Sequence, residues 1–327
     1  MLAVHEQPCC VCGENNSRLF HEAIYPEHNY PGTFFLRKCE GCGLLFNSPR
    51  LDDVELANLY GSNYYFFRRN DSRELERIVG MYQRTIGLID GDLDDRRSID
   101  IGTGRGYLPA VLKELGWQAR GIELSADAAG YARSEFLLDI FTGTVEQYAA
   151  SPDAKVFPVV TAIDVIEHVP SPGAFIEAIA KVLTGGGYLI IDTPNALADN
   201  ITLKKTAWKG FNPFHIYLFS IDTLTALLSR YGLKVERSFS YGNTPTPRDF
   251  RDRMASFIRK TPLARKAAEI YFSGRDKGDV ARSPRSGVEA AAAKVRSAPK
   301  YTSTPDATAP LAASKTGDNI VVIARKG

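Results

Sequence analysis

The stretch Ile99-Asp100-Ile101-Gly102-Thr103-Gly104-Arg105-Gly106-Tyr107-Leu108 decides the fold of this chain. The apolar residues before it predict a buried strand, and the residues from 107 to 115 have the spacing of a helix that ends at Gly116. Glycines in such a turn let the backbone approach a ligand closely, and the first turn of the helix offers unbonded N–H groups. We therefore expect a ligand at the carboxyl edge of a sheet.

Two acidic residues indicate what this ligand is. Asp100 stands two residues before the first glycine, where a carboxylate would repel a pyrophosphate but attract a cationic amino-acid group. Glu123 ends the next predicted strand, where an acid can accept hydrogen bonds from a ribose diol. The glycine order is G-x-G-x-G, whereas dinucleotide sites have G-x-G-x-x-G. These features favour S-adenosylmethionine over NAD, with a dinucleotide site or a plain structural turn as the alternatives.

Short apolar runs alternate with helical stretches from residue 97 to about residue 240. We expect strands over 98–101, 119–123, 138–141, 156–163, 188–192 and 233–240. We expect helices over 107–115, 126–134, 145–149, 172–183 and 221–231. The segment NIVVIA at 319–324 adds a last strand. This alternation predicts βαβ units and a mostly parallel sheet with right-handed crossovers.

The chain resembles the class I S-adenosylmethionine-dependent methyltransferases in IDIGTGRGYL, GIELS, GTVEQY, TAIDVIEHVPSPGAFI, LTGGGYLIIDTPN and HIYLFS. The resemblance covers about half the chain. It implies an α/β, Rossmann-like, seven-stranded sheet with helices on both faces and an antiparallel last strand. It also implies that the glycine loop contacts the methionine end of the cofactor and that the acid after the second strand binds the ribose. The cofactor-binding residues that it implies are Asp100, Gly102, Thr103, Gly104, Gly106, Glu123, Leu124, Val145, Glu146, Asp164 and Val165.

Four of the five cysteines form two pairs, Cys9-x-x-Cys12 and Cys39-x-x-Cys42, each followed by a glycine. Four thiolates at this spacing can close a tetrahedron around zinc, and the glycine lets each knuckle turn tightly. In a reducing compartment, paired cysteines indicate metal before they indicate disulfides. We predict a structural Zn²⁺ site in a zinc-binding module over residues 1–60, with Cys10 outside it. Buried thiols that bind no metal are the alternative.

Residues 1–60 carry eight acidic and four basic residues, whereas a nucleic-acid module needs a basic face. The residues after Asp164 are Val165-Ile166-Glu167, without the Asp/Asn-Pro-Pro-aromatic motif of enzymes that methylate base or amide nitrogen. We therefore do not expect a nucleic-acid partner.

His168 and His215 are the candidate catalytic residues, because they are the two histidines outside the N-terminal module. His168 follows Asp164 and Glu167 at the predicted mouth of the sheet. His215 lies in a loop whose aromatic side chains we expect to form an apolar wall around an acceptor: Trp208, Phe211, Phe214 and Tyr217. A helix-capping role for His168, a packing role for His215, and transfer without any general base are the alternatives.

The predicted function is methyl transfer to a small-molecule acceptor, with O-methylation of a sugar, polyketide, quinone or lipid-linked precursor preferred. The zinc module and the segment GLLFNSPR after it resemble deoxysugar C-methyltransferases, so C-methylation of a deoxysugar is a second hypothesis. The sequence ends after the methyltransferase sheet, where that group carries a further domain. Methylation of RNA or protein is a third hypothesis, and a non-catalytic scaffold that keeps the cofactor fold is a fourth.

The net charge of +2 hides a basic segment, because residues 248–300 carry 14 Lys and Arg against 6 Asp and Glu. We divide the chain into the zinc-binding module, a helical connector over 61–97 and a methyltransferase domain over 98–327. An insert at 243–318 is expected to be partly disordered, with no structure from about residue 273 to residue 315. Without a signal peptide or an apolar spanning run, the sequence predicts a cytoplasmic protein. Peripheral membrane contact through the basic segment 250–272 is the alternative to a solvated helix there.

Overall fold

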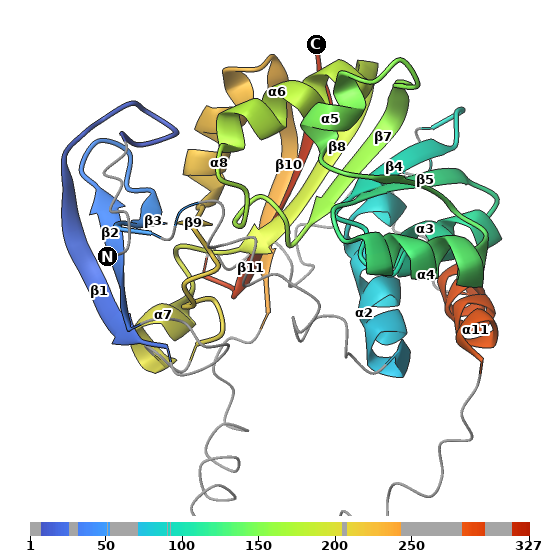
Figure 1. Ribbon diagram of the computed structural model, residues 1–327, viewed down its shortest axis with the longest axis horizontal. Helices are drawn as coiled ribbons and strands as arrows, with labels where there is room; N and C mark the ends of the chain where they lie inside the picture. The colour runs from blue at the N-terminus through green and yellow to red at the C-terminus, as the bar shows by residue number, and fades with distance from the viewer. Residues whose placement is uncertain are drawn as a thin grey trace, which may run out of the picture.

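A seven-stranded sheet forms the centre of the larger part of the protein (Figure 1). Its strands in spatial order are β10 (Leu233–Tyr241), β11 (Asn319–Lys326), β8 (Leu183–Pro194), β7 (Phe157–Ile163), β4 (Arg97–Ile101), β5 (Gln118–Glu123) and β6 (Asp139–Thr142). β11 runs antiparallel to both of its neighbours, whereas every pair from β8 to β6 is parallel. The predicted Rossmann-like sheet is therefore confirmed.

The computed structural model describes residues 8–25, 32–50, 52, 71–89, 91, 93–204, 208–242, 283–297 and 316–327. The basic segment 250–272, for which we considered membrane contact, lies outside the described residues. No helix among the described residues is both long and apolar enough to cross a bilayer.

Helices cover both faces of the sheet (Figure 1). The first face is covered by α2 (Asp71–Arg84), α3 (Tyr107–Glu114), α4 (Ala126–Phe136) and α11 (Pro284–Ser297), and the second by α5 (Val145–Ala149), α6 (Pro172–Val182) and α8 (Ile221–Ser229). Neighbouring residues of β11 show the alternation of strand side chains, since Val321 belongs to the first core and Val322 to the second. Because β4 to β8 are parallel, their carboxyl ends lie on the same side of the sheet, which we call its open edge.

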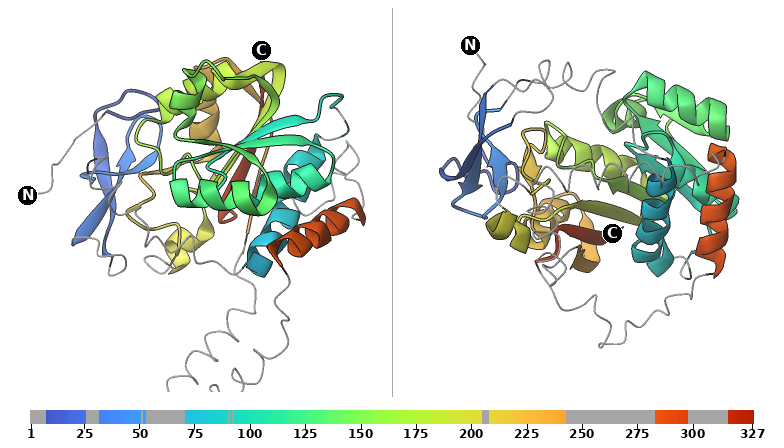
Figure 2. Two further views of the ribbon diagram at one scale, coloured as in Figure 1. Left: turned by 45° about the vertical axis from the view of Figure 1, so that its right-hand side comes forward. Right: turned by 90° about the horizontal axis from the view of Figure 1, so that it is seen from below.

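Helix α11 corrects our expectation for the insert. The composition predicts no structure from about residue 273 to 315, but Pro284–Ser297 is helical and buries Val288, Ala291 and Ala292 against α2, α3 and α4 (Figure 2). Arg285 Nε donates to the carbonyl of Glu135 at 2.6 Å. The expectation is wrong here because a composition rich in alanine and lysine also suits a helix, and this one has an apolar stripe at i, i+3 and i+4.

A second, four-stranded sheet lies beside the larger one and joins segments that are far apart in the sequence (Figure 1). Its order is β1 (Ser17–Ile24), β2 (Thr33–Cys39), β3 (Leu45–Asn47) and β9 (Tyr217–Leu218), all antiparallel. The fourth strand belongs to the loop that carries His215, so the N-terminal sheet is completed by residues 170 positions or more downstream of β3. A short helix, α7 (Asp199–Lys204), and a turn of 3₁₀ helix at Ile86–Leu88 lie outside both sheets.

The aromatic side chains of the 208–219 loop pack against this second sheet. Trp208 and Phe211 share a core with Phe34 and Leu36, and both are at most 6% exposed. Tyr217 joins the core that also contains Cys9, the first of the four paired cysteines. All four aromatics of the expected wall are at most 6% exposed: Trp208, Phe211, Phe214 and Tyr217. Their contact with an acceptor stays a prediction.

Candidate functional site

The glycine loop joins β4 to α3 at the open edge of the larger sheet. Gly102, Gly104 and Gly106 all have positive φ, from +57° to +78°. The N–H of Gly102 donates to the carbonyl of Ile122 at 2.9 Å, which ties the loop to β5. A Cβ on Gly102 would lie 2.6 Å from Cγ2 of Val165, so the loop also contacts the segment after β7. This position requires glycine for both its dihedral angle and its space.

Glu123 connects the glycine loop to the next helix. Its Oε2 accepts a hydrogen bond from the N–H of Gly104 at 2.7 Å, and its Oε1 accepts one from the N–H of Ser125 at 2.8 Å. Burial raises the pKa of Glu123 above its ordinary value, although these N–H groups favour the charged form. Carboxylate oxygens have further lone pairs, so Glu123 can fix the loop and still accept hydrogen bonds from a diol.

Asp100 is buried in β4, with 5% of its surface exposed. Its Oδ1 accepts a hydrogen bond from Thr161 Oγ1 in the neighbouring strand β7 at 2.6 Å. Burial raises the pKa of Asp100 to about 6, against the hydrogen bonds that lower it. A carboxyl group in this state is stabilised as the anion by a cation that binds next to it.

The other predicted cofactor residues lie at the carboxyl ends of β4, β5, β6 and β7, with very different exposures. Leu124 is 67% exposed, Thr103 is 9% exposed, and Glu146 is half-buried in the first turn of α5. Val145 is only 1% exposed and packs in the core, so a cofactor contact there would come from its backbone.

Asp164 is held by an arginine from the predicted connector. Arg77 of α2 donates from Nη1 to Asp164 Oδ2 at 3.0 Å. Asp164 has φ +53°, an uncommon backbone conformation for a residue other than glycine. The ion pair therefore brings α2 to the open edge of the sheet, next to the glycine loop.

Asp192 is another buried acid and lies near Asp164, close to the end of β8. The hydroxyl of Tyr241 donates to Asp192 Oδ2 at 2.6 Å, and the guanidinium of Arg84 lies 4.1 Å from the centre of the Tyr241 ring. Burial, with the negative charge of Asp164, raises the pKa of Asp192 to about 7. The edge thus holds several acids in a partly dry environment.

The structure brings the two candidate catalytic histidines together. The rings of His168 and His215 lie 4.8 Å apart at an angle of 71°. The Nδ1 of His168 is 2.9 Å from the carbonyl of Phe214, and the Nδ1 of His215 is 3.0 Å from the carbonyl of Gly210. Burial lowers the pKa of both histidines. A carbonyl oxygen can only accept a hydrogen bond, so each Nδ1 carries a proton, and the lone pair of the neutral form of each ring lies on Nε2.

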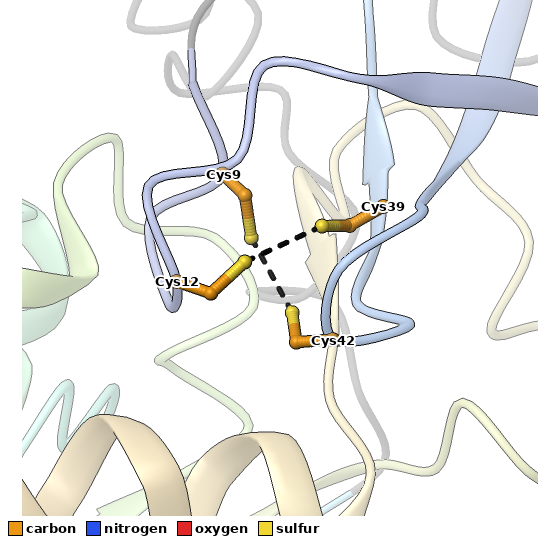
Figure 3. A group of neighbouring side chains, drawn as sticks. All are labelled: Cys9, Cys12, Cys39 and Cys42. Atoms are coloured by element: carbon orange, nitrogen blue, oxygen red, sulfur yellow. Dashed lines mark hydrogen bonds between the residues drawn. The ribbon is translucent and has the colours of Figure 1, made fainter.

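The four paired cysteines converge on one point between two chain turns (Figure 3). Cys9 Sγ lies 3.5 Å from Cys42 Sγ, and Cys12 Sγ lies 3.5 Å from Cys39 Sγ. Disulfide sulfurs are about 2 Å apart, whereas sulfurs that share a zinc ion at about 2.3 Å are separated by about 3.8 Å. Gly13 and Gly43 have φ +77° and +81°, as expected for the turns after each pair. The cluster fits a tetrathiolate metal site and excludes Cys10.

The profile of the methyltransferase domain family matches residues 67–238, which is more than half of the chain. This chain belongs to the methyltransferase domain family. The match covers the glycine loop, Glu123 and both histidines, but not the cysteine pairs or β11.

Curated relatives of the methyltransferase domain are similar over a shorter stretch. The ubiquinone biosynthesis O-methyltransferase of Burkholderia vietnamiensis is 38% identical over 116 residues, which are 34% of this chain and 50% of that protein. The protein of the same description from Burkholderia lata is 37% identical over the same length, with the same coverage. The chain spans about half the length of the curated relatives it matches.

Solved methyltransferase structures superpose on a larger share of this chain, but loosely. A SAM-dependent methyltransferase from Archaeoglobus fulgidus has a TM-score of 0.49 and 17% identity, covering 84% of this chain and 100% of that one. A possible histamine N-methyltransferase from Thermotoga maritima has a TM-score of 0.45 and 17% identity, covering 84% and 97%. The strand order and the family match, rather than these superpositions, define the fold.

Several residues of the methyltransferase edge are not identified by the sequence patterns. Arg77 gives no signal, because it lies outside the recognisable motifs and reaches the edge only through the packing of α2. Asp192 does give a sequence signal, because it is an acid at the end of the apolar run YLIID. Glu123 is recognised from the same kind of position, at the end of a predicted strand. Tyr241 pairs with Asp192 across the antiparallel part of the sheet, which only the tertiary structure could reveal.

Proposed function

We propose that this chain is an S-adenosylmethionine-dependent methyltransferase that methylates a hydroxyl group of a small molecule. The observation that carries this proposal is the glycine loop, closed on Glu123 by the hydrogen bond from Gly104 within a matched methyltransferase domain. A dinucleotide fingerprint is absent from this loop, whose glycines run G-x-G-x-G. The site chemistry and the family membership thus support the same cofactor.

In this proposal, the cofactor lies along the carboxyl ends of β4 to β7. Asp100 faces the cationic methionine end, and Glu123 accepts hydrogen bonds from the ribose. Leu124, which is exposed, and Glu146 border the adenine, while Asp164 and Val165 approach the methyl-transfer side. The loop is shaped by Gly102, Thr103, Gly104 and Gly106. Val145 is in the core, and its backbone is proposed to contact the cofactor.

The acceptor is proposed to be a small hydroxylated molecule: a sugar, polyketide, quinone or lipid-linked precursor. The Burkholderia relatives are described as ubiquinone biosynthesis O-methyltransferases, which favours a hydroxyl group of a quinone precursor among these. The relatives match only 34% of this chain, so the acceptor has to be identified by experiment.

The transfer itself is a displacement at the sulfonium methyl group. The acceptor oxygen forms the new C–O bond as the C–S bond breaks, and the electron pair of that bond passes to sulfur to give S-adenosylhomocysteine. The hydroxyl proton must leave the acceptor, and we assign it to Nε2 of His168 or His215. His168 is three residues after Val165, which contacts Gly102, and the ring of His215 lies 4.8 Å from the ring of His168.

We also propose that Cys9, Cys12, Cys39 and Cys42 bind one structural zinc ion. The Sγ separations of 3.5 Å and the exclusion of Cys10 support this assignment. Burial raises the pKa of Cys9, which is the effect that a bound cation reverses by stabilising thiolates. A complete tetrathiolate shell leaves no open position for catalysis. The ion would hold together the two chain turns that carry Cys9, Cys12, Cys39 and Cys42.

Isothermal titration of the full chain with S-adenosylmethionine tests the cofactor, and methyl transfer from labelled cofactor to a panel of phenols, sugars and lipid-linked precursors tests the acceptor class. We expect binding and labelling of at least one hydroxylated small molecule. Absence of cofactor binding would refute the enzyme assignment. Labelling of RNA or protein alone would refute a small-molecule acceptor.

A further inference from the structure

Glu167, His168 and His215 form a compact group at the open edge of the sheet. One ligand atom from each of the three side chains lies within 4.8 Å of the others. Glu167 and His168 follow β7, while His215 lies in the loop before β9, so the group exists only in the folded chain. Ligands that share one ion at about 2.1 Å lie about 3–4 Å apart, so the side chains need only small shifts to share one.

The hydrogen bonds of the two histidines orient them for a cation. In each ring, Nδ1 donates its proton to a backbone carbonyl, of Phe214 for His168 and of Gly210 for His215. The lone pair of each neutral ring is then on Nε2. Metal-binding histidines have this arrangement, in which the second nitrogen is fixed by a carbonyl or carboxylate. The Nε2 of His168 lies 3.9 Å from Glu167 Oε1.

The carboxyl group of Glu167 has only half of its hydrogen bonding satisfied. Its Oε2 accepts from the hydroxyl of Thr193 at 2.9 Å. Its Oε1 is buried and has no hydrogen-bond partner among the described residues, although the side chain is 1% exposed. An unsatisfied buried carboxylate oxygen costs more than about 1–3 kcal/mol, so such groups in native proteins normally have a ligand or ion.

The charges around Glu167 also indicate that its carboxylate binds a cation. Arg77 pairs with Asp164, whereas no lysine or arginine among the described residues forms an ion pair with Glu167. Asp164 and Asp192 add negative charge nearby. A divalent cation would satisfy the orphaned oxygen and offset these acids at once.

We propose that Glu167, His168 and His215 bind a divalent transition-metal cation of the Mn²⁺, Fe²⁺, Co²⁺ or Zn²⁺ class. Two imidazoles and one carboxylate are donors that suit these ions and leave open positions for a further ligand. This site is separate from the four cysteines, whose thiolates select softer ions. Its role rests on the proposed function: the open positions would take the acceptor oxygen and favour its ionised form. With the cation bound, Nε2 of each histidine would be a ligand and not the acceptor of the hydroxyl proton, which would pass to solvent.

The position of the group agrees with such a role. Val165, which contacts the glycine loop at Gly102, is two residues before Glu167. The backbone N–H of Tyr217 donates to the carbonyl of Glu167 at 3.2 Å, which keeps the two halves of the group in register. A cation here would lie between the proposed methionine end of the cofactor and the 208–219 loop.

The test is Mn²⁺ binding to full-length protein that elemental analysis shows to hold no more than one zinc per chain, followed by electron paramagnetic resonance and by titration calorimetry. We expect about one Mn²⁺ per chain in the wild type, and at least tenfold weaker binding in both Glu167→Gln and His215→Ala. Gln can still accept the Thr193 hydrogen bond, so Glu167→Gln removes the charge with little other change. Glu177→Gln, which alters an exposed carboxylate paired with Lys181, is the matched control and should bind as the wild type does.

The outcomes separate this inference from the proposed function. Cofactor binding without any Mn²⁺ binding, or with equal Mn²⁺ affinity in both variants, overturns the cation site and leaves the methyltransferase proposal standing. Mn²⁺ binding that both variants lose, in a chain that binds no S-adenosylmethionine, supports the site and refutes the proposed function. Unchanged thermal melting of the variants shows that a loss of Mn²⁺ is not a loss of fold.

Discussion

The side-chain amide of Asn47 donates a hydrogen bond to the carbonyl oxygen of His215 at 3.0 Å. The same amide donates to Pro213 at 3.2 Å, and the backbone N–H of Asn47 donates to Ile216 at 2.8 Å. Asn47 ends β3, just after the second cysteine pair, and is 4% exposed. The N-terminal module therefore sets the position of a candidate catalytic histidine in the methyltransferase domain.

Asn47→Ala should lower methyl transfer more than it lowers cofactor affinity. The substitution leaves the carbonyls of Pro213 and His215 without their donor, at a cost of about 1–3 kcal/mol in unfolding free energy. Methyl transfer from labelled cofactor and calorimetric titration with S-adenosylmethionine would measure activity and affinity, and denaturant unfolding would measure the loss of stability. Asn212→Ala, in the same loop, removes a side chain that caps the turn and serves as the comparison. Equal losses of cofactor affinity and of activity in Asn47→Ala would contradict this coupling.

Removal of the zinc ion should destabilise the protein from its N-terminal module. We expect about one tightly held zinc per chain, a lower melting temperature after chelation, and the same loss in Cys39→Ser. Cys10→Ser is the control, because Cys10 is adjacent to the cluster in sequence but outside it in space. Elemental analysis and thermal melting would check this. Metal content that stays the same in Cys39→Ser and in the wild type would rule out the tetrathiolate site.

Asp100→Asn and Glu123→Gln should each weaken binding of S-adenosylmethionine by about 10- to 100-fold, or about 1.4–2.8 kcal/mol. The first removes the charge that faces the cationic end of the cofactor. Glu123→Gln puts an NH₂ group in place of one carboxylate oxygen. This NH₂ cannot accept the hydrogen bond that the N–H of Gly104 or of Ser125 donates there. Asp95→Asn, at an exposed carboxylate paired with Arg97, should bind the cofactor normally. Calorimetric affinities equal to wild type in both variants would move the cofactor site elsewhere.

The pH dependence of the unfolding free energy should show the raised pKa of Asp192. Its folded-state pKa of about 7 exceeds the ordinary value of 3.8, so the folded chain holds a proton that the unfolded chain releases between about pH 4 and pH 7. The free energy of unfolding therefore falls as pH rises through that window, by at most about 1.4 kcal/mol per pH unit from Asp192. Asp192→Asn removes this loss while its carbonyl can still accept from Tyr241.

Denaturant unfolding of wild type and Asp192→Asn at about pH 4.5, 5.5, 6.5 and 7.5 would measure the difference. We expect the variant to gain stability relative to wild type as pH rises. A difference that does not change with pH would show that Asp192 keeps an ordinary pKa.

The local chemistry of the sequence determined the glycine loop, the acid at the end of β5, the cysteine pairs and the alternation of parallel strands with helices. In each case the signal is short in range: Gly102 and Gly104 need positive φ, and an acid at the end of an apolar run marks the open edge of a sheet. The antiparallel last strand came from the resemblance, and the structure confirms it. Helix α11 could have been predicted from its own stripe, had composition not outweighed periodicity.

Only the tertiary structure decided which distant side chains meet. Arg77 and Asp164, Asn47 and His215, and Tyr241 and Asp192 are each separated by 49 to 168 residues, so no spacing rule connects them. The same is true of Glu167 and His215, whose contact depends on β9 completing the N-terminal sheet. Local propensity determines where each strand ends. The packing of the two sheets around the 208–219 loop determines that His215 lies next to Glu167 and His168 at the open edge.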